Sequence, residues 1–283
     1  KNIIKVLEIK TKNATEIGFT ELAIPKLKEK DVLVKVNYAP LYHYEMMRMA
    51  GLTGTEFPYS PCGECSGVVE DAYSKSLIGR KVNVFSLKNR SLANRQLVSE
   101  EEISLLDDEV DLKQGSLYSC NPLTSIGLVE MVQSSGAKAF AITAGNSSIG
   151  KIINRIAQYK GLTCISVVRS EQRKSEMEKE GFGPIINSEE DGFTERLSKI
   201  LVDNKASIIL DTLAGPIAGQ LMKALPKNGI LVNFGTQTHE PYSGIDATDM
   251  RWNNKEMKVF LLGPWIHEKI KLGVYSSYKT NIS

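Results

Sequence analysis

The residues with the clearest chemical potential in this sequence form one glycine-containing turn, Ala144–Gly150. It follows the apolar run Ala139–Thr143 and leads into a helical pattern, so helix amides and the positive end of a helix dipole would suit a phosphate here. Gly145 would make the tight turn and Gly150 would let the helix pack on a sheet, while Ser147 stands where another glycine would open the backbone to a diphosphate. The predicted phosphate site comprises Gly145, Asn146, Ser147, Ser148, Ile149 and Gly150.

A basic residue closes the next apolar run. Thr163–Val168 ends at Arg169, where chains that bind NAD place an acidic residue against the ribose 2′-hydroxyl. An arginine could instead pair with a 2′-phosphate through its planar fork of donors, and Arg173 would strengthen the same positive field one turn later. The alternative is a solvated basic turn at the start of a helix. The position favours a site for NADPH over NADH.

The elements around this turn repeat regularly over the second part of the chain. Short apolar runs alternate with amphipathic segments of helical length, which is typical of βαβ units and a doubly wound parallel sheet. The expected strands are Ala139–Thr143, Thr163–Val168, Ile185–Ile186, Ser207–Leu210 and Ile230–Phe234, and the expected helices are Leu123–Ser134, Ile149–Lys160, Glu171–Glu180, Phe193–Asp203 and Ala214–Leu225.

The first third of the chain has a different pattern, with many short strands and little helix, which favours a barrel-like domain. The last residues, Gly273–Ser283, are polar and are expected to form a frayed tail. The sequence therefore predicts an α/β protein of two parts. In the first part the expected strands are Ile3–Ile9, Val32–Val36, Glu64–Glu70 and Lys81–Phe85, with one short helix at Tyr44–Ala50.

Composition limits the classes of function. The chain has 283 residues, with 35 Lys and Arg against 33 Asp and Glu, a near-balance that argues against a dedicated nucleic-acid surface. No apolar run approaches the roughly 18 residues needed to cross a bilayer. Four cysteines are too few for a secreted disulfide framework, which favours a reducing compartment. The chain starts at Lys1, and either a cleaved targeting peptide or a missing N-terminal segment would explain that start.

Several motifs occur in the order found in one group of reductases. They are Asn37–Pro40 followed by Gly51, then Pro61–Val69, Asn121–Thr124, Asp211–Gly215, Val232–Gly235 and Leu261–Trp265. Over this span the chain resembles zinc-free members of the medium-chain dehydrogenase/reductase superfamily, the quinone oxidoreductases and 2-enoyl thioester reductases. The resemblance implies a GroES-like β-barrel domain over 1–120, a Rossmann NADP-binding domain over 121–264 and a short tail over 265–283.

The same resemblance assigns residues that position a cofactor. The family's glycine-rich turn falls on Gly145–Gly150, and its phosphate-selecting arginine falls on Arg169. A threonine that approaches the nicotinamide falls on Thr124. The loops that flank the nicotinamide and its ribose fall on Phe234, Gly235 and Thr236, and on Leu262 through Trp265.

Three neighbouring side chains are the candidates for proton transfer. His43 lies between Tyr42 and Tyr44, on the segment that faces the cofactor cleft in the proteins that this chain resembles. Any of the three could donate a proton to a carbonyl or an enolate. The plainer interpretation of His43 is a half-buried histidine at the start of a helix.

The sequence also departs from the family pattern. Zinc-dependent relatives carry a cysteine near Tyr42 and a histidine at Gly63, and without both ligands a catalytic zinc has no tetrahedral cage, so no metal is predicted. The pair Cys62 and Cys65 lacks further ligands at metal spacing. Leu52–Thr53 stands where enoyl reductases place a tyrosine.

The preferred hypothesis is a metal-free, NADPH-dependent reductase that passes hydride to a quinone, an α,β-unsaturated carbonyl or an enoyl thioester. The alternative is a catalytically degenerate relative that serves as a structural or accessory subunit of a larger complex, for instance in mitochondria; Ser147 and the missing tyrosine favour it. We expect a small-molecule substrate, no nucleic acid and no membrane span. We also expect a homodimer or a larger assembly, in the mitochondrial matrix or the cytoplasm.

Overall fold

Six short strands form one parallel sheet in the structure, a computed structural model that describes residues 3–87 and 90–280. The sheet order is β10-β9-β8-β11-β12-β13, so the order reverses between β8 and β11, as in a doubly wound fold. Every residue of β8 is buried, because helices cover both faces of the sheet. The strands are β8 (Ala139–Thr143), β9 (Thr163–Val168), β10 (Ile185–Asn187), β11 (Ile208–Asp211), β12 (Ile230–Asn233) and β13 (Glu256–Val259).

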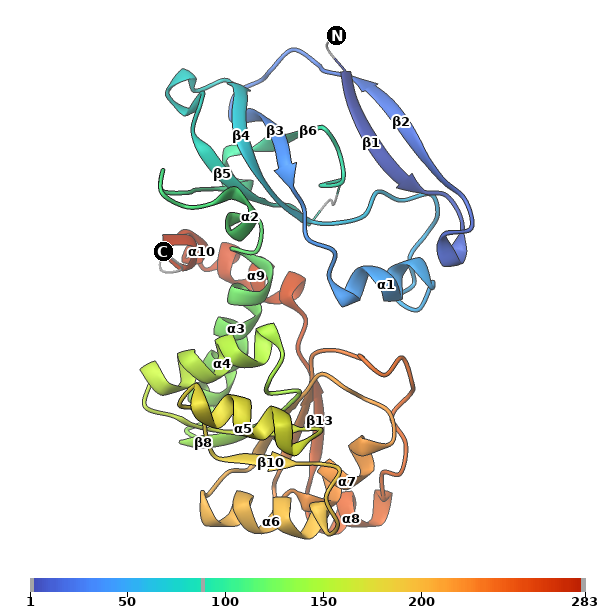
Figure 1. Cartoon of the computed structure of the whole chain (residues 1–283), viewed down its shortest axis with the longest axis vertical. Helices are drawn as coiled ribbons and strands as arrows, with labels where there is room; N and C mark the ends of the chain where they lie inside the picture. The colour runs from blue at the N-terminus through green and yellow to red at the C-terminus, as the bar shows by residue number, and fades with distance from the viewer. Residues whose placement is uncertain (1–2, 88–89, 281–283) are drawn as a thin grey trace. The chain divides into compact units, whose positions relative to one another are not determined.

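Alternate side chains of each strand feed two separate cores. Phe140 and Ile142 pack with α3 and α4, whereas Ala139 and Ala141 pack with α6 and α7 on the opposite face (Figure 1). This α/β unit spans Asn121–Glu268. The helices that follow its strands, or begin and end the unit, are α3 (Cys120–Ser134), α4 (Ser148–Tyr159), α5 (Glu171–Lys179), α6 (Phe193–Asp203), α7 (Ile217–Ala224), α8 (Ala247–Trp252) and α9 (Leu262–Lys271).

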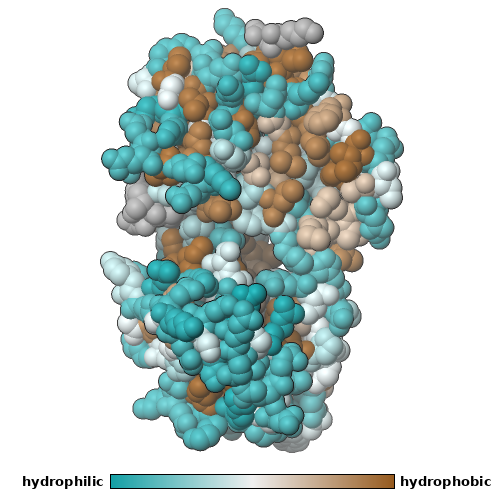
Figure 2. All heavy atoms as spheres, in the orientation of Figure 1, coloured by the Kyte–Doolittle hydropathy of each residue, from teal (hydrophilic) through white to brown (hydrophobic). Residues whose placement is uncertain are grey.

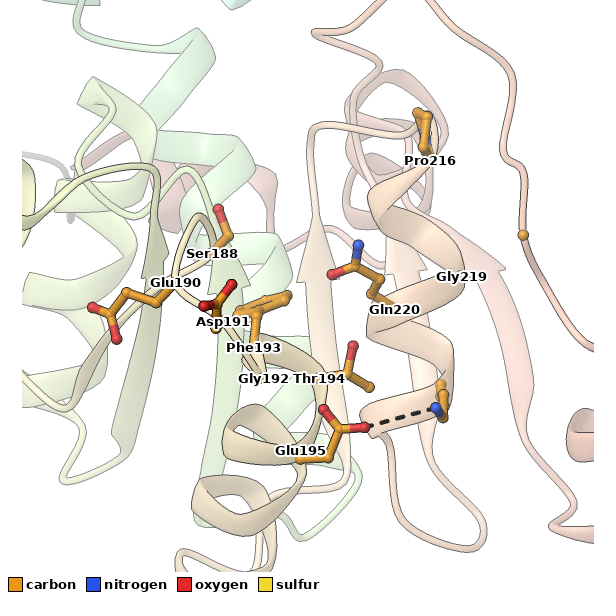
Figure 3. Close-up of a pocket in the computed structure, with 12 residues that line it drawn as sticks. Ser188, Glu190, Asp191, Gly192, Phe193, Thr194, Glu195, Pro216, Gly219 and Gln220 are labelled. Atoms are coloured by element: carbon orange, nitrogen blue, oxygen red, sulfur yellow. Dashed lines mark ion pairs between the residues drawn. The ribbon is translucent and has the colours of Figure 1, made fainter.

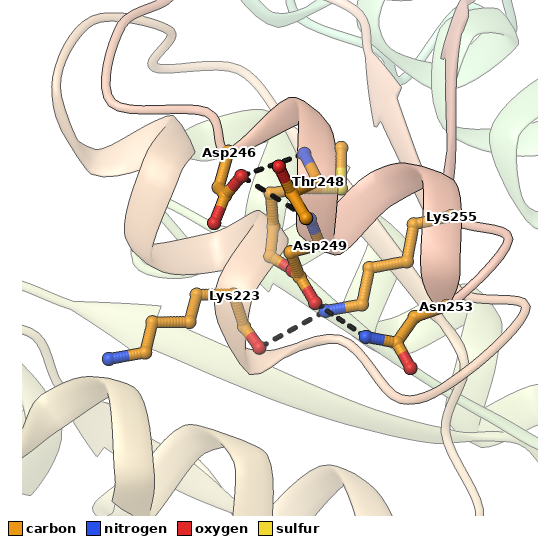
Figure 4. Close-up of polar contacts among 7 residues, drawn as sticks. Lys223, Asp246, Thr248, Asp249, Asn253 and Lys255 are labelled. Carbon is orange, nitrogen blue, oxygen red and sulfur yellow. Dashed lines mark hydrogen bonds and ion pairs between the residues drawn. The ribbon is translucent and has the colours of Figure 1, made fainter.

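The side chain of a buried lysine, Lys255, donates hydrogen bonds to carbonyl groups in the last turn of one of these helices. Lys255 Nζ donates to the carbonyl oxygens of Met222 at 2.9 Å and Lys223 at 3.3 Å, in the last turn of α7 (Figure 4). The ammonium thereby satisfies carbonyls at the negative end of the α7 dipole. It also pairs with Asp249 at 2.7 Å. Burial would raise the pKa of Asp249, but the hydrogen bond and charge of Lys255 hold that pKa below its usual value.

The other unit, Lys1–Cys120 with Lys269–Ser283, is built on antiparallel strands. A five-stranded sheet has the order β6-β3-β4-β5-β7, and β1 and β2 form a separate hairpin. The core of the five-stranded sheet contains Val32, Val34, Val69, Val82 and Val84, which are β-branched residues suited to a pleated surface. The strands are β1 (Ile3–Ile9), β2 (Ile17–Ala23), β3 (Asp31–Tyr38), β4 (Glu64–Ala72), β5 (Lys81–Phe85), β6 (Arg95–Ser99) and β7 (Ile103–Leu105), with helices α1 (His43–Met49) and α2 (Leu112–Gly115).

The C-terminal segment differs from its prediction. The expected frayed tail contains a short helix, α10 (Tyr275–Thr280), which belongs to the antiparallel unit. Lys279 Nζ donates to the carbonyl oxygens of Glu101 at 2.7 Å and Ile103 at 2.5 Å. Burial lowers the pKa of Lys279 to about 8, even though Glu102 and Glu101 act to raise it. The polar composition of this segment did not predict the contact, because the contact depends on the side chain of a single lysine.

The predicted fold class, an α/β protein with an antiparallel β-rich part and a doubly wound Rossmann part, is confirmed. The predicted strands β1, β5, β8 and β9 and helix α6 have the bounds that periodicity indicated. Four strands were missed: β2, β6, β7 and β13. β2 is mostly exposed, and all four residues of β13 are exposed, so neither carries a strong apolar pattern.

The surface divides unevenly between the two units. Figure 2 shows mainly hydrophilic side chains over α4, α5 and α6, while apolar side chains gather over β2 and α1. Phe19 is 65% exposed on β2, and Met46 is 56% exposed on α1. No helix within the described ranges is long and apolar enough to cross a membrane.

Candidate functional site

The glycine turn connects β8 to α4, as predicted, but its left-handed residue is Ala144, with φ +51°. Gly145 lies in the turn, which the Ser147 amide closes on the Ala144 carbonyl oxygen at 2.9 Å, but it does not have the left-handed conformation. Gly145 is required for a different reason: a Cβ there would lie 2.5 Å from Ser166 Cβ on β9. A Cβ on Gly150 would lie 2.5 Å from the Gly145 carbonyl oxygen, so this glycine lets α4 close onto the turn.

Ser147 caps α4. Its Oγ accepts a hydrogen bond from the Gly150 amide at 3.1 Å, so the side chain occupies one of the helix-start donors. The hydroxyl proton can still be donated. Ser148 is exposed, and Asn146 and Ile149 are half-buried, so the predicted residues of the turn do come together at one helix start. The first turn of α4 retains amides without an intrahelical partner.

A buried polar pair holds the turn from behind, and sequence reasoning missed it. Asn154 Nδ2 donates to the Gly150 carbonyl oxygen and to Ser166 Oγ, each at 2.9 Å. Asn154 and Ser166 are both buried. The available signal was a single asparagine on the apolar face of α4, one turn after Gly150. These bonds tie α4 to β9 beneath the predicted phosphate-binding turn.

The two predicted arginines differ in availability. Arg169 follows β9 directly and is exposed, and it forms no ion pair with any residue in 3–87 or 90–280. Arg173 lies in α5, and its Nη1 is 3.0 Å from Glu176 Oε2. The neighbouring Ser170 caps α5 by accepting the Arg173 amide at 3.2 Å. Arg169 is therefore the cation that is free to meet a phosphate.

A buried carboxylate that sequence reasoning did not single out lies at the carboxyl end of β11. Asp211 is fully buried, and its Oδ1 accepts the Thr143 hydroxyl at 2.7 Å, which joins β11 to β8. The amides of Leu213 and Ala214 donate to the same carboxylate, each at 3.0 Å. The Tyr242 hydroxyl donates to Oδ2 at 2.7 Å. This carboxylate fixes the edge of the sheet where its strand order reverses.

The predicted loop Phe234–Thr236 is held by the loop that follows β11. A Cβ on Gly235 would lie 2.4 Å from Thr212 Oγ1, so only glycine permits this approach. The amide of Gln237 donates to the Thr212 carbonyl oxygen at 2.9 Å, and Phe234 is half-buried against the core of α3 and α4. The two loops therefore form one paired rim on the carboxyl edge of the sheet.

The remaining predicted cofactor residues lie on α3 and α9. Thr124 is half-buried in α3. Leu262 and Trp265 pack against the same core cluster as α3 and α4, and a Cβ on Gly127 would lie 3.0 Å from the Trp265 ring. The structure therefore brings Trp265 against α3, one turn after Thr124.

The proton-transfer candidates all lie in the antiparallel unit, where their settings differ. Tyr44 is 58% exposed and His43 is exposed. Tyr42 is half-buried, and its hydroxyl donates to Glu64 Oε2 at 2.6 Å. Glu64 is buried at the start of β4 and was not predicted as a site residue. No set of three His, Cys, Asp or Glu side chains is grouped for a metal in the described part of the chain.

A polar hollow opens beside the sheet, with a volume of about 530 Å³. Figure 3 shows Ser188 and Asp191 from the loop after β10 facing Gln220 from α7, with Glu195 paired to Lys223 at 3.8 Å. None of the residues that line it belongs to the glycine turn. The hollow is therefore distinct from the predicted phosphate site.

The residues present fit a phosphorylated dinucleotide. Helix-start amides and two serine hydroxyls gather at the turn, and the unpaired Arg169 guanidinium follows the neighbouring strand. Both lie at the carboxyl edge of a sheet whose order reverses beside β8, where open α/β sheets bind ligands. Donors and positive charge of this kind suit a diphosphate and a 2′-phosphate.

Comparison with known proteins agrees with this fold. The chain is 26% identical over 274 residues to the mitochondrial enoyl-[acyl-carrier-protein] reductase of Dictyostelium discoideum, covering 93% of this chain and 75% of that protein. The Escherichia coli quinone oxidoreductase complexed with NADPH has a TM-score of 0.77 at 16% identity, covering 98% of this chain and 89% of that one. The mitochondrial 2-enoyl thioester reductase heterodimer of Candida tropicalis has a TM-score of 0.78 at 16% identity, covering 99% and 87%. No family model matches the chain.

Proposed function

We propose that this chain, a homologue of the quinone oxidoreductases and mitochondrial enoyl thioester reductases of the zinc-free medium-chain dehydrogenase/reductase superfamily, is an NADPH-dependent reductase. Its substrate class is a quinone or an α,β-unsaturated carbonyl compound, including an enoyl thioester. The single observation that carries this proposal is the glycine turn followed by the unpaired Arg169, on successive strands of a doubly wound sheet.

The chain's own residues bind and orient the cofactor. The start of α4 and the hydroxyls of Ser147 and Ser148 would hold the diphosphate, and Arg169 would select the 2′-phosphate. The rim containing Phe234–Thr236 and the α9 residues Leu262 and Trp265 would flank the nicotinamide end. When bound, the nicotinamide supplies the hydride, so the protein contributes position and field.

Removing the Arg169 guanidinium tests this assignment. In Arg169→Ala, NADPH affinity should fall roughly ten- to hundredfold while NADH affinity changes little, because only NADPH carries the phosphate that the arginine pairs with. Binding is measured by calorimetry and by the rise in melting temperature that each nucleotide causes. Arg173→Ala is the matched control, because its guanidinium already pairs with Glu176; we expect its NADPH affinity to change by less than about fivefold.

Two outcomes of that experiment would reject the proposal. An unchanged ratio of NADPH to NADH affinity in Arg169→Ala would show that another group reads the phosphate. Wild-type protein that neither nucleotide stabilises would instead favour the accessory-subunit hypothesis.

A homodimer is the assembly that the surface of the α/β unit supports. β13 is an edge strand, and its Met257 and Val259 are 40% and 66% exposed, so backbone donors and apolar side chains are both available for pairing. Val259→Lys should convert the dimer to a monomer in sedimentation, whereas Val202→Lys on exposed α6 should not. A monomeric wild-type chain would contradict this assembly.

We infer the compartment from the relatives. The Dictyostelium discoideum and Arabidopsis thaliana proteins are named as mitochondrial, and this supports a mitochondrial location for the chain. Detection of the native protein in purified mitochondria, and not in the cytosolic fraction, is the expected result.

A further inference from the structure

The strand order of the α/β unit determines which half of a bound dinucleotide reaches which loop. The glycine turn follows β8, and Arg169 follows β9, which pairs with one side of β8. β11 pairs with the other side of β8, and β12 lies beyond it. With the diphosphate at the turn and the 2′-phosphate at Arg169, the adenosine half lies over β9, so the nicotinamide half extends over β11 and β12. The rim formed by the loops after β11 and β12 is therefore the part of this unit that receives the nicotinamide half.

A tyrosine hydroxyl links two side chains at this rim. The Tyr242 hydroxyl donates to Asp211 Oδ2 at 2.7 Å and accepts Asn233 Nδ2 at 2.7 Å. Asn233 Nδ2 also donates to the Gly235 carbonyl oxygen at 2.5 Å and lies 3.5 Å from the Asp211 carbonyl oxygen. A side-chain amide carries two N–H groups, and here they serve the hydroxyl and the backbone of the rim. One hydrogen-bond network therefore leads from Asp211 through Tyr242 and Asn233 to Gly235.

The first member of this network is firmly held. Asp211 is fully buried, and its carboxylate also accepts the Thr143 hydroxyl at 2.7 Å and the amides of Leu213 and Ala214, each at 3.0 Å. Thr143 is the last residue of β8, the strand that leads into the glycine turn. The Tyr242 hydroxyl is therefore fixed relative to the same strand that carries the predicted phosphate site.

The last member of the network is a glycine at a close backbone approach. A Cβ on Gly235 would lie 2.4 Å from Thr212 Oγ1, and the amide of the preceding Phe234 donates to the Asp211 carbonyl oxygen at 2.9 Å. A glycine presents its backbone to a ligand in place of a side chain. The hydrogen bond from Asn233 to the Gly235 carbonyl oxygen therefore helps to set the shape of the rim.

Tyr242 comes from outside the rim and is suited to holding it. It lies in the segment between β12 and α8, and its ring packs against the core cluster shared by α6 and α7. Burial, followed by the charge of Asp211, raises the pKa of Tyr242 well above its usual value. The hydroxyl therefore stays protonated, with its donor and acceptor roles filled by Asp211 and Asn233.

We infer that Tyr242 is a positioning residue for the nicotinamide half of the cofactor, because it holds Gly235 and the surrounding rim in place through Asn233. This inference rests on the proposed reductase function. In the part of the chain that the structure describes, no hydrogen bond joins Tyr242 or Asn233 to the glycine turn or to Arg169. Loss of the Tyr242 hydroxyl should therefore weaken the hold on one half of the cofactor and spare the other.

The experiment compares NADPH with adenosine 2′,5′-bisphosphate, which contains the adenosine half with its 2′-phosphate and lacks the nicotinamide half. In Tyr242→Phe we expect the Kd for NADPH to rise about tenfold and the Kd for the bisphosphate to change less than about twofold, both measured by calorimetry on the full chain. Tyr159→Phe, which removes an 84% exposed hydroxyl from α4 of the same unit, is the matched control and should change neither Kd.

A second variant tests the path through the asparagine. Asn233→Ala removes the donor to the Gly235 carbonyl oxygen and leaves Tyr242 in place. We expect it to raise the Kd for NADPH by a similar factor. The double variant should bind NADPH no more weakly than the weaker of the two single variants, because both changes break the same network. Two factors that multiply in the double variant would overturn the inference, since Tyr242 would then act by another route.

The fluorescence of NADPH supplies a readout that a general loss of stability would not move. The emission comes from the reduced nicotinamide, so its wavelength and intensity report the surroundings of that ring. At saturating NADPH, wild-type protein and Tyr159→Phe should shift the emission to the blue and strengthen it. The emission with Tyr242→Phe should lie close to that of free NADPH. Identical emission from the cofactor bound to wild-type protein and to Tyr242→Phe would overturn the positioning role.

The remaining outcomes separate the two proposals. Wild-type protein that binds neither NADPH nor the bisphosphate removes the reductase function and the positioning role with it. Wild-type protein that binds both ligands, with a Tyr242→Phe variant that loses affinity for both equally or for neither, leaves the reductase standing and overturns the positioning role.

Discussion

Each unit of this protein buries one carboxylate that accepts a tyrosine hydroxyl, but the two pairs differ in what surrounds the tyrosine. The Tyr242 hydroxyl donates to Asp211 at 2.7 Å and also accepts Asn233 Nδ2 at 2.7 Å. The Tyr42 hydroxyl donates to Glu64 and has no second partner within the described ranges. A tyrosine hydroxyl that both donates and accepts is held by two partners, whereas one that only donates is held by one. The same pair of residue types therefore holds its tyrosine more firmly in the α/β unit than in the antiparallel unit.

The largest expected loss of unfolding free energy comes from removing the Asp211 carboxylate, which accepts the Tyr242 hydroxyl. Asp211→Ala leaves the Thr143 and Tyr242 hydroxyls and the amides of Leu213 and Ala214 without their acceptor in a buried site. We expect the free energy of unfolding to fall by about 3 kcal/mol or more, because buried donors lose charged partners. Urea denaturation measures the change. Asp203→Ala, which removes only an exposed partner of Lys199, should change it by less than about 0.5 kcal/mol. Equal losses in the two variants would contradict the bracing role.

The free energy of unfolding, measured as a function of pH, should reveal the raised pKa of Glu64. Because the pKa of Glu64 is raised in the folded chain, the folded state binds a proton more tightly than the unfolded state. Above the unfolded pKa, stability should therefore decrease as pH rises towards the folded pKa, by at most about 1.4 kcal/mol per pH unit from this group. Glu64→Gln should remove that component of the slope. Identical slopes in the two proteins would refute the assignment.

The smallest expected losses of unfolding free energy come from removing the hydroxyls of Tyr242 and Tyr42, one at a time. Tyr242→Phe removes a donor from Asp211 and an acceptor from Asn233, so we expect a loss of about 1 to 2 kcal/mol in unfolding free energy. Tyr42→Phe removes a single hydrogen bond and should cost about 1 kcal/mol or less. Paired denaturation curves measure the difference. A greater loss in Tyr42→Phe would contradict this comparison.

The sequence could locate those candidate site residues that lie next to a strand in the chain. The turn Ala144–Gly150 and Arg169 each sit next to a strand, so their place at the sheet edge follows from the βαβ pattern alone. Asp211 was visible only as part of a family motif, and Glu64 was not visible as a site residue at all. Its partners Tyr42, Asn83 and Ser119 are distant in sequence, so no local spacing could connect them.

The sequence by itself determined the strands and helices of the doubly wound unit, because burial on both faces of a parallel sheet imposes continuous apolar runs that helical periods interrupt. It also determined that a basic residue, Arg169, directly follows β9, beside the proposed phosphate site. Tertiary structure alone decided which carboxylates are buried, which hydroxyls reach them and which arginine is left unpaired. Those properties depend on packing between distant segments, and hydrogen-bond capacity is exhausted or left open only when the segments meet.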